Sequence, residues 1–140
     1  MKKKILSLVL VLGTVFVLTG CGNKPSTLVC SQKVSNINVE INANFAGNKV
    51  KSMGLKYDMD YSKYSDTYVE TVSKQDFCKT VTSAMSSQFT LVDCKQTTNG
   101  KNIVIKSGID ISKLSSSSLT GSPSATKTEL EKQGYSCTLK

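Results

Sequence analysis

Two consecutive runs of alternating apolar and polar residues constrain the fold of this chain more than any other feature. In residues Ile37–Phe45 and again in residues Met53–Tyr61, the apolar side chains occupy the odd positions. Side chains of a β-strand point alternately to its two faces, so each run predicts a strand with one buried face. The Ala46-Gly47-Asn48 segment between the runs predicts a turn, and we therefore expect an antiparallel hairpin.

The length of this turn decides which residues face each other. A two-residue turn at Gly47-Asn48 would place odd positions opposite even ones, and the two apolar sets would then lie on different faces. We therefore expect a three-residue loop, which places Ile41 opposite Met53 and Val39 opposite Leu55. With this register, both apolar sets lie on one face of the hairpin.

A second hairpin is expected further along the chain. Residues Phe89–Gln96 and Asn102–Ile111 flank Asn99-Gly100, which is among the strongest short signals for a hairpin turn. The expected register places Cys94 opposite Ile105, with both side chains directed toward the core. The helix that precedes this hairpin should cover the same face.

Two helices and a last strand complete the expected fold. Residues 62–88 are predicted to be mostly helical, and their apolar face would consist of Phe77, Val81, Ala84, Met85 and Gln88, with Cys78 at its margin. After a serine-rich loop at 112–122, a short helix is expected over Ser124–Gln133 and a strand over Tyr135–Leu139. The predicted fold class is therefore α+β, with two antiparallel hairpins and a short C-terminal strand packed against one long and one short helix.

The first twenty residues have the character of an export signal. Three lysines precede the apolar stretch Ile5–Val17, which would form a helix of roughly 20 Å, too short for the ~30 Å core of a bilayer. The next residues, Leu18-Thr19-Gly20-Cys21, resemble the lipobox of bacterial lipoproteins. The resemblance implies cleavage before Cys21 and a diacylglycerol group on its thiol. We therefore expect a signal peptide at 1–20, a lipidated tether at 21–27 and a single domain at 28–140.

The remaining four cysteines predict two disulfides. With Cys21 as the lipid carrier, an even number of thiols is left in a chain that is expected to be exported. Cys30 opens the first strand region and Cys137 lies in the closing strand, so the two ends of the domain are expected to meet in the sheet. Cys78 on the helix and Cys94 on the next hairpin face each other across the core. We therefore predict the pairs Cys30–Cys137 and Cys78–Cys94, with four free buried thiols as the alternative.

The composition excludes several kinds of catalytic site. The chain has no histidine, which excludes Ser-His-Asp triads, Cys-His pairs and imidazole metal ligands. The segment Asp58–Asp66 has oxygen ligands at alternate positions, but Lys63 stands where a calcium loop requires glycine and Val69 where it requires glutamate. The Ser-x-x-Lys spacing at Ser124–Lys127 has no companion motifs and is expected by chance. We therefore expect no enzyme activity, metal or cofactor.

The positive charge of the chain does not indicate a particular ligand. Beyond residue 20 it carries 15 lysines, no arginine and 10 acidic residues, with the lysines scattered singly. No basic run is interleaved with aromatic residues, so we expect no nucleic-acid binding. The charge favours solubility, or a weak attraction to an anionic membrane surface.

A cluster of tyrosines is the first candidate for a binding site. Four of the five tyrosines, Tyr57, Tyr61, Tyr64 and Tyr68, fall within twelve residues that also contain several aspartates. Such rings can stack against a ligand while the phenols form hydrogen bonds, so a cell-wall glycan or peptide is the expected ligand. The alternative is that these rings pack in the core.

The whole chain has a family resemblance. The lipobox, the opening Leu28-Val29-Cys30-Ser31, two hairpins flanking a helix and the closing Gln133-Gly134-Tyr135-Ser136-Cys137 are similar to small Firmicutes lipoproteins of unknown function, and they resemble the YehR-type lipoprotein family. The resemblance implies no catalytic residues. We expect a monomeric binding or accessory module on the extracytoplasmic face of the cell membrane, anchored through Cys21. The alternatives are a structural or inhibitory surface protein and, less favoured, a hydrolase with an unrecognised site.

Overall fold

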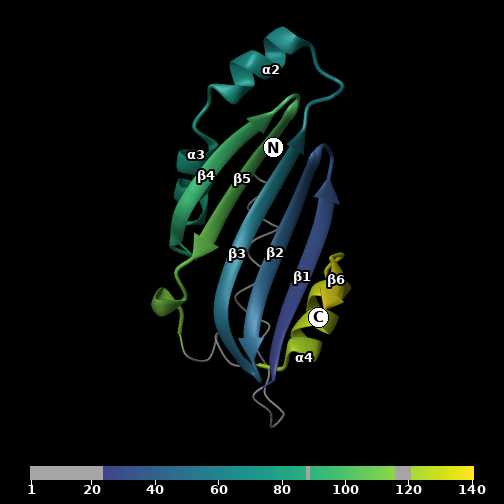
Figure 1. Ribbon diagram of the computed structural model, residues 1–140, viewed down its shortest axis with the longest axis vertical. Helices are drawn as coiled ribbons and strands as arrows, with labels where there is room; N and C mark the ends of the chain where they lie inside the picture. Colours follow the sequence, from purple (N-terminus) through teal and green to yellow (C-terminus); the bar gives the residue numbers. More distant parts are fainter. Residues whose placement is uncertain (1–23, 88, 116–120) are drawn as a thin grey trace.

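The computed structural model describes residues 24–87, 89–115 and 121–140. These residues form a six-stranded antiparallel sheet with three α-helices, which confirms the α+β class (Figure 1). The elements in chain order are β1 (Pro25–Val34), β2 (Ile37–Ala46), β3 (Lys49–Asp60), α2 (Asp66–Ser73), α3 (Phe77–Met85), β4 (Leu91–Asn99), β5 (Asn102–Ile109), the 3-10 helix η1 (Ile111–Lys113), α4 (Pro123–Lys132) and β6 (Ser136–Leu139).

The strands are ordered β4-β5-β3-β2-β1-β6 across the sheet. The sequence predicted the two hairpins β2–β3 and β4–β5 and the last strand, but not β1, whose sequence lacks a clear alternation. β1 begins at Pro25, within the segment 21–27 that we expected to be the tether. It pairs with β2 on one side and with β6 on the other, so the C-terminal strand completes the edge of the sheet.

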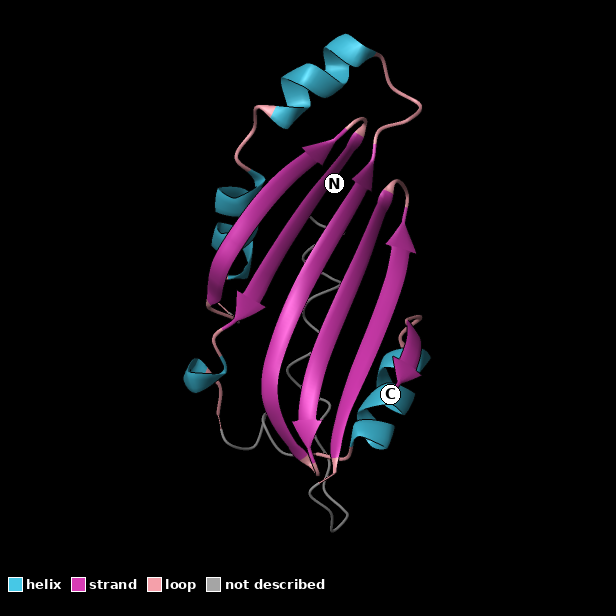
Figure 2. Ribbon diagram, in the orientation of Figure 1, coloured by secondary structure: helices cyan, strands magenta, loops and turns pink. Residues whose placement is uncertain are grey.

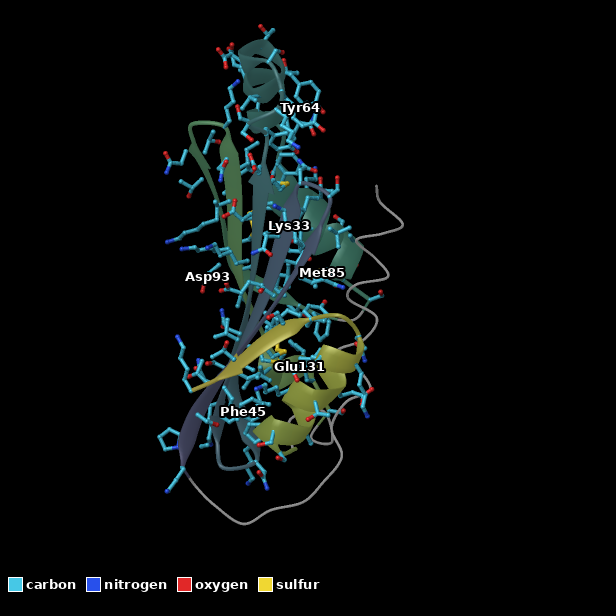
Figure 3. All side chains as sticks on the ribbon, turned by 90° about the vertical axis from the view of Figure 1, so that its right-hand side faces the viewer. Lys33, Phe45, Tyr64, Met85, Asp93 and Glu131 are labelled. Atoms are coloured by element: carbon cyan, nitrogen blue, oxygen red, sulfur yellow. A yellow bond between two sulfur atoms is a disulfide. The ribbon has the colours of Figure 1, made fainter. Side chains whose placement is uncertain are left out.

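In the part of the chain that the structure describes, helices cover one face of the sheet and leave the other face open. The helices α3 and α4 lie on the covered face, α3 against β4 and α4 against β1 and β6, while Asp93 lies on the open side (Figures 2 and 3). The central strands supply much of the core from alternate positions: Val39, Ile41, Ala43 and Phe45 from β2, Met53, Leu55, Tyr57 and Met59 from β3, and Ile103, Ile105 and Ile109 from β5. Alternation of the side chains thus buries one face and leaves polar residues on the other.

The prediction of a three-residue loop between β2 and β3 is wrong. The turn has two residues, Gly47 and Asn48, with Gly47 at a φ of 61°. A β-bulge near the turn then shifts the register, so that Ile41 lies opposite Leu55 and not opposite Met53. The extra residue of the bulge brings the two apolar sets onto one face, which is the condition that the longer loop was meant to satisfy.

In the second hairpin, the pairing of β4 with β5 is shifted by two residues from the predicted register. Its turn lies at Gly100-Lys101, and Gln96 lies opposite Ile105 where Cys94 was expected. A second irregularity between Val92 and Lys95 includes Asp93, which has a φ of 54°. Because a shift of two residues preserves the face, Cys94 still points to the covered side as predicted.

The single long helix expected over 62–88 is two short helices. Ser65 begins α2 by accepting a hydrogen bond from the backbone N–H of Tyr68, and Asp76 begins α3 by accepting one from Lys79. Each oxygen satisfies an N–H group that has no partner within its helix. The expected helix near the C-terminus is α4, capped by Ser122 and followed by Gly134 at a φ of 93°.

The two disulfides join the pairs that the sequence predicted. Cys30 and Cys137 lie directly opposite each other on β1 and β6, with their Cα atoms 4.1 Å apart. Cys78 on α3 is bonded to Cys94 on β4 across a Cα distance of 5.8 Å. Two disulfides in so small a domain indicate an extracytoplasmic location. None of the helices in the described part of the chain is long and apolar enough to span a membrane.

Candidate functional site

Three of the four candidate tyrosines come together at one end of the sheet. The rings of Tyr64 and Tyr68 are stacked, with centroids 4.9 Å apart and planes at 18°. Tyr61 meets Tyr64 nearly edge-on at 5.5 Å and lies 6.1 Å from Tyr68. Figure 3 shows Tyr64 at the tip of the molecule, next to α2. We refer to Tyr61, Tyr64 and Tyr68 as the tyrosine cluster.

The backbone around the tyrosine cluster is held by several hydrogen bonds. The N–H of Tyr61 donates to the carbonyl of Lys101 at 2.9 Å, and the N–H of Tyr64 donates to the carbonyl of Tyr61 at 2.9 Å. The Lys101 ammonium donates to the Tyr64 carbonyl at 2.8 Å and pairs with Asp66 at 2.9 Å. The rings therefore sit on a corner that is tied to the β4–β5 turn, which fixes their positions before any ligand binds.

The rings of the tyrosine cluster are available to a ligand. Tyr68 is 46% exposed and Tyr64 is 38% exposed, which makes them two of the three large apolar side chains that are exposed in the described part of the chain. Tyr61 is half-buried, and this burial together with its two aromatic neighbours raises the pKa of its phenol. The phenol hydroxyls can donate and accept hydrogen bonds beside exposed ring surface, a combination suited to binding a ligand.

The carboxylate of Asp60, the residue before Tyr61, is held in the ionised form. Its Oδ1 accepts a hydrogen bond from the backbone N–H of Ser62 at 2.8 Å, and the hydrogen bonds from Ser62 lower the pKa of Asp60 below its usual value. Asp66, the first residue of α2, is also exposed. Two exposed carboxylates therefore belong to the same segment of the chain as the rings, and that of Asp66 is paired with Lys101.

Tyr57, the fourth candidate, lies in the core, apart from the tyrosine cluster. It is 4% exposed, and its hydroxyl donates to the Sδ atom of Met85 at 3.7 Å. Burial, together with the nearby phenol of Tyr135, raises the pKa of Tyr57 to about 12. Its position on β3 explains the difference, because Tyr57 is on the inward face of the strand and Tyr61 follows the strand's end.

A second feature of the surface was not predicted from the sequence. The open face of the sheet contains a hollow of about 660 Å³, whose lining includes Gly54, Lys56, Lys95, Lys106 and Gly108. Lys56 lies opposite Lys106, Lys106 lies opposite Lys95, and Gly54 lies opposite Gly108. Only the strand register reveals this arrangement, because each lysine appears isolated in the sequence.

The other motifs that the sequence singled out are not assembled into sites. Within residues 24–87, 89–115 and 121–140, no group of three or more acidic or cysteine side chains could hold a metal ion. Asp58 accepts a hydrogen bond from Asn102 at 3.3 Å. On α4, Ser124 is exposed and Lys127 pairs with Glu131 at 3.8 Å. Residues 116–120 of the expected serine-rich loop and Cys21 with its lipobox lie outside the described residues.

No protein-family model, curated protein or solved structure matches this chain. The chemistry of the tyrosine cluster and of the open sheet face is therefore the basis for the function considered next.

Proposed function

We propose that this protein is a non-catalytic binding module of the cell envelope, anchored to the membrane by lipid on Cys21 and contacting its ligand through the tyrosine cluster. The observation that carries this proposal is the group of three rings, two of them stacked and exposed, at the end of a disulfide-bonded domain. The extracytoplasmic location follows from the disulfides, and the lipid anchor rests on the sequence Leu18-Thr19-Gly20-Cys21.

The position of the tyrosine cluster relative to the anchor supports this function. β1 starts at Pro25 and extends for 10 residues, or about 33 Å, to Val34. Val34 pairs with Ile37, and Ile37 pairs with Met59, two residues before Tyr61. Pro25 and Tyr61 therefore lie at opposite ends of the sheet. A chain anchored four residues before Pro25 can present the tyrosine cluster away from the membrane.

The chemistry around the rings favours a glycan as the ligand. Sugar rings have apolar faces that stack on aromatic rings and hydroxyls that bind to carboxylates and phenols. The tyrosine cluster supplies exposed rings, and the exposed carboxylates of Asp60 and Asp66 lie in the same segment of the chain. A peptide could use the same rings and is the alternative that the binding test must separate from a glycan.

The anchor can be tested independently of the ligand. Mass spectrometry of the protein from its native host should find Cys21 as a lipid-modified N-terminus, and the Cys21→Ser variant should leave the membrane fraction. Two acyl chains give stable attachment where one chain gives only marginal binding. An intact Met1, or an unmodified Cys21 in the membrane fraction, would show that the anchor is wrong.

The binding surface can be tested with paired substitutions. The soluble domain, which is the chain from Gly22 to Lys140 without the signal peptide and the lipidated Cys21, is incubated with insoluble cell-envelope glycan, or with the same material after removal of its peptides, and the bound fraction is measured. Tyr64→Ala and Tyr68→Ala should each weaken binding by about tenfold, because each removes a stacking ring. Tyr64→Phe and Tyr68→Phe keep the rings and should retain most of the affinity.

A matched control is provided by Val92, the third exposed large apolar residue, which is 37% exposed on β4. Val92→Ala should bind as the wild type does, because Val92 lies away from the tyrosine cluster. Binding that is unaffected by both alanine substitutions in the cluster would refute the proposed surface. Binding that disappears when peptides are removed would assign the ligand to the peptide class.

A further inference from the structure

Three lysines form a row across the open face of the sheet. In the register of β3, β5 and β4, Lys56 lies opposite Lys106 and Lys106 lies opposite Lys95, and all three line the same hollow of about 660 Å³. Directly opposed side chains on neighbouring strands are about 5 Å apart at their Cβ atoms, and like charges at this distance destabilise a sheet. We refer to Lys56, Lys106 and Lys95 as the lysine row.

No lysine of the lysine row forms an ion pair with a carboxylate among the described residues. The four ion pairs among the described residues involve other lysines, in α2, in the β4–β5 turn and in α4. Glu40, opposite Lys56, and Asp93, near Lys95, line the two sides of the hollow, yet neither forms an ion pair with the lysine row. The ammonium groups in the middle of the hollow therefore remain available to an anion from outside.

Two glycines line the hollow beside the lysine row. Gly54 and Gly108 lie opposite each other on β3 and β5, two residues along each strand from Lys56 and Lys106. A Cβ atom at Gly54 would lie 2.9 Å from Oδ1 of Asn42, and one at Gly108 would lie 3.1 Å from Cγ2 of Val92. Glycine at these two positions thus leaves room for the side chains of Asn42 and Val92, and it keeps the surface beside the lysine row low.

We propose that this hollow binds a small phosphorylated sugar, with the phosphoryl group on the lysine row. Three ammonium groups suit an oxyanion that carries about two negative charges, and the side chains of Asn42, Thr97 and Asn99 line the same hollow and can bind sugar hydroxyls. The site is separate from the tyrosine cluster, so it does not depend on the function proposed for those rings.

The shape and the charges of the hollow favour this ligand over a membrane or a long polyanion. The surface is concave, and Glu40 and Asp93 stand at its two sides. These carboxylates would repel a chain of negative charges that extended beyond the lysine row and would repel an anionic lipid surface. A single phosphoryl group can be held by the lysine row without extending past either carboxylate.

The proposal is tested by titrating the soluble domain with glucose 6-phosphate in a calorimeter, with glucose, inorganic phosphate and phosphatidylglycerol vesicles as comparisons. Glucose 6-phosphate should bind most tightly, and its affinity should fall as salt is added. Lys106→Gln and Lys56→Gln should each weaken binding by about tenfold, because each removes a charged hydrogen-bond donor. Lys79→Gln, an exposed lysine of α3 on the opposite face, should bind as the wild type does.

A second measurement does not depend on the ligand. Lys106 takes part in both like-charged pairs, so the ligand-free Lys106→Gln variant should unfold at a higher temperature than the wild type, and Lys79→Gln should not. Glucose 6-phosphate should then raise the unfolding temperature of the wild type more than that of Lys106→Gln. The proposal is overturned if glucose 6-phosphate does not bind, if the lysine-row variants bind it as the wild type does, or if only the vesicles bind.

Discussion

The side chain of Gln96 on β4 accepts a hydrogen bond from the backbone N–H of Phe77, the first residue of α3, at 2.9 Å. Its amide nitrogen donates to the carbonyl of Gln75 at 2.9 Å and to that of Ser73 at 3.2 Å. One side chain of the sheet thus satisfies three backbone groups in the break between α2 and α3. This contact holds both helices against the sheet, and with them the chain that leads to the tyrosine cluster.

Replacing Gln96 should therefore destabilise the fold. Gln96→Ala removes both donors and the acceptor and should lower the free energy of unfolding by about 1–3 kcal/mol, as measured by urea denaturation. Gln96→Glu keeps an acceptor for Phe77 but turns a carboxylate oxygen toward the carbonyls of Ser73 and Gln75, so it should destabilise the fold as well. Thr98→Ala, an exposed neighbour on the same strand, is the control. A Gln96→Ala variant as stable as this control would show that the three hydrogen bonds contribute nothing.

The two disulfides should contribute unequally to stability. Cys30 and Cys137 are 107 residues apart, and Cys78 and Cys94 are 16 apart. The chain-entropy model assigns about 4.7 kcal/mol to a loop of the first size and about 3 kcal/mol to one of the second. The double variant Cys30→Ser/Cys137→Ser should therefore have a lower urea midpoint than Cys78→Ser/Cys94→Ser.

Each double variant removes both partners of one disulfide and leaves no new free thiol. The two variants therefore compare the loss of the long loop with the loss of the short loop. The opposite order of midpoints would mean that the tie between α3 and β4 stabilises the native state by more than loop entropy. A thiol titration of the unfolded, unreduced domain should find no free cysteine among these four.

Tyr57 should make the protein sensitive to alkali. Burial raises the pKa of Tyr57 from 10.0 to about 12. The unfolded chain releases this proton near pH 10 and the folded chain only near pH 12. The free energy of unfolding is therefore unaffected by the titration of Tyr57 below pH 10, and it falls as the pH rises from 10 to 12. The loss due to Tyr57 should be about 2 kcal/mol.

Comparison with Tyr57→Phe separates this effect from the titration of lysines, which the variant shares. Unfolding free energies are measured from about pH 9 to about pH 12, and the wild type should lose more stability than Tyr57→Phe over that range. Tyr135→Phe should behave similarly, because burial raises the pKa of Tyr135 to about 12 as well. Parallel profiles for the wild type and both variants would contradict the assignment of these phenols to the core.

The sequence predicted the elements with strong periodicity and the cysteine pairs. Alternation in β2 and β3 was sufficient for two strands, and the odd number of cysteines together with the lipobox pointed to two disulfides. The turns were less certain, because a bulge can change which residues face each other while the apolar pattern stays the same. β1 was missed because its alternation is weak, although its partner β2 follows directly after the turn at Ser35-Asn36, and because its other partner, β6, lies at the far end of the chain.

The break between α2 and α3 could not be predicted from local signals alone. The hydrogen bonds that satisfy it come from Gln96, some twenty residues later. The candidate site was predicted in part. Proximity in the sequence suggested that four tyrosines form one site. Tyr57, however, lies within β3 and faces the core, while the other three follow the end of that strand and come together. The lysine row required the register of three strands.

The most direct test of the proposed binding surface compares the five tyrosines in one experiment, with the two buried rings as internal controls for the three rings of the tyrosine cluster. The soluble domain is labelled at its tyrosine rings and titrated with a soluble fragment of cell-envelope glycan, and the ring resonances are followed by NMR. The resonances of Tyr61, Tyr64 and Tyr68 should shift together with one saturating curve, while those of Tyr57 and Tyr135, which are 4% and 5% exposed, should stay in place. Resonances of the tyrosine cluster that do not move at any glycan concentration, or shifts at Tyr57 and Tyr135 alone, would contradict the account.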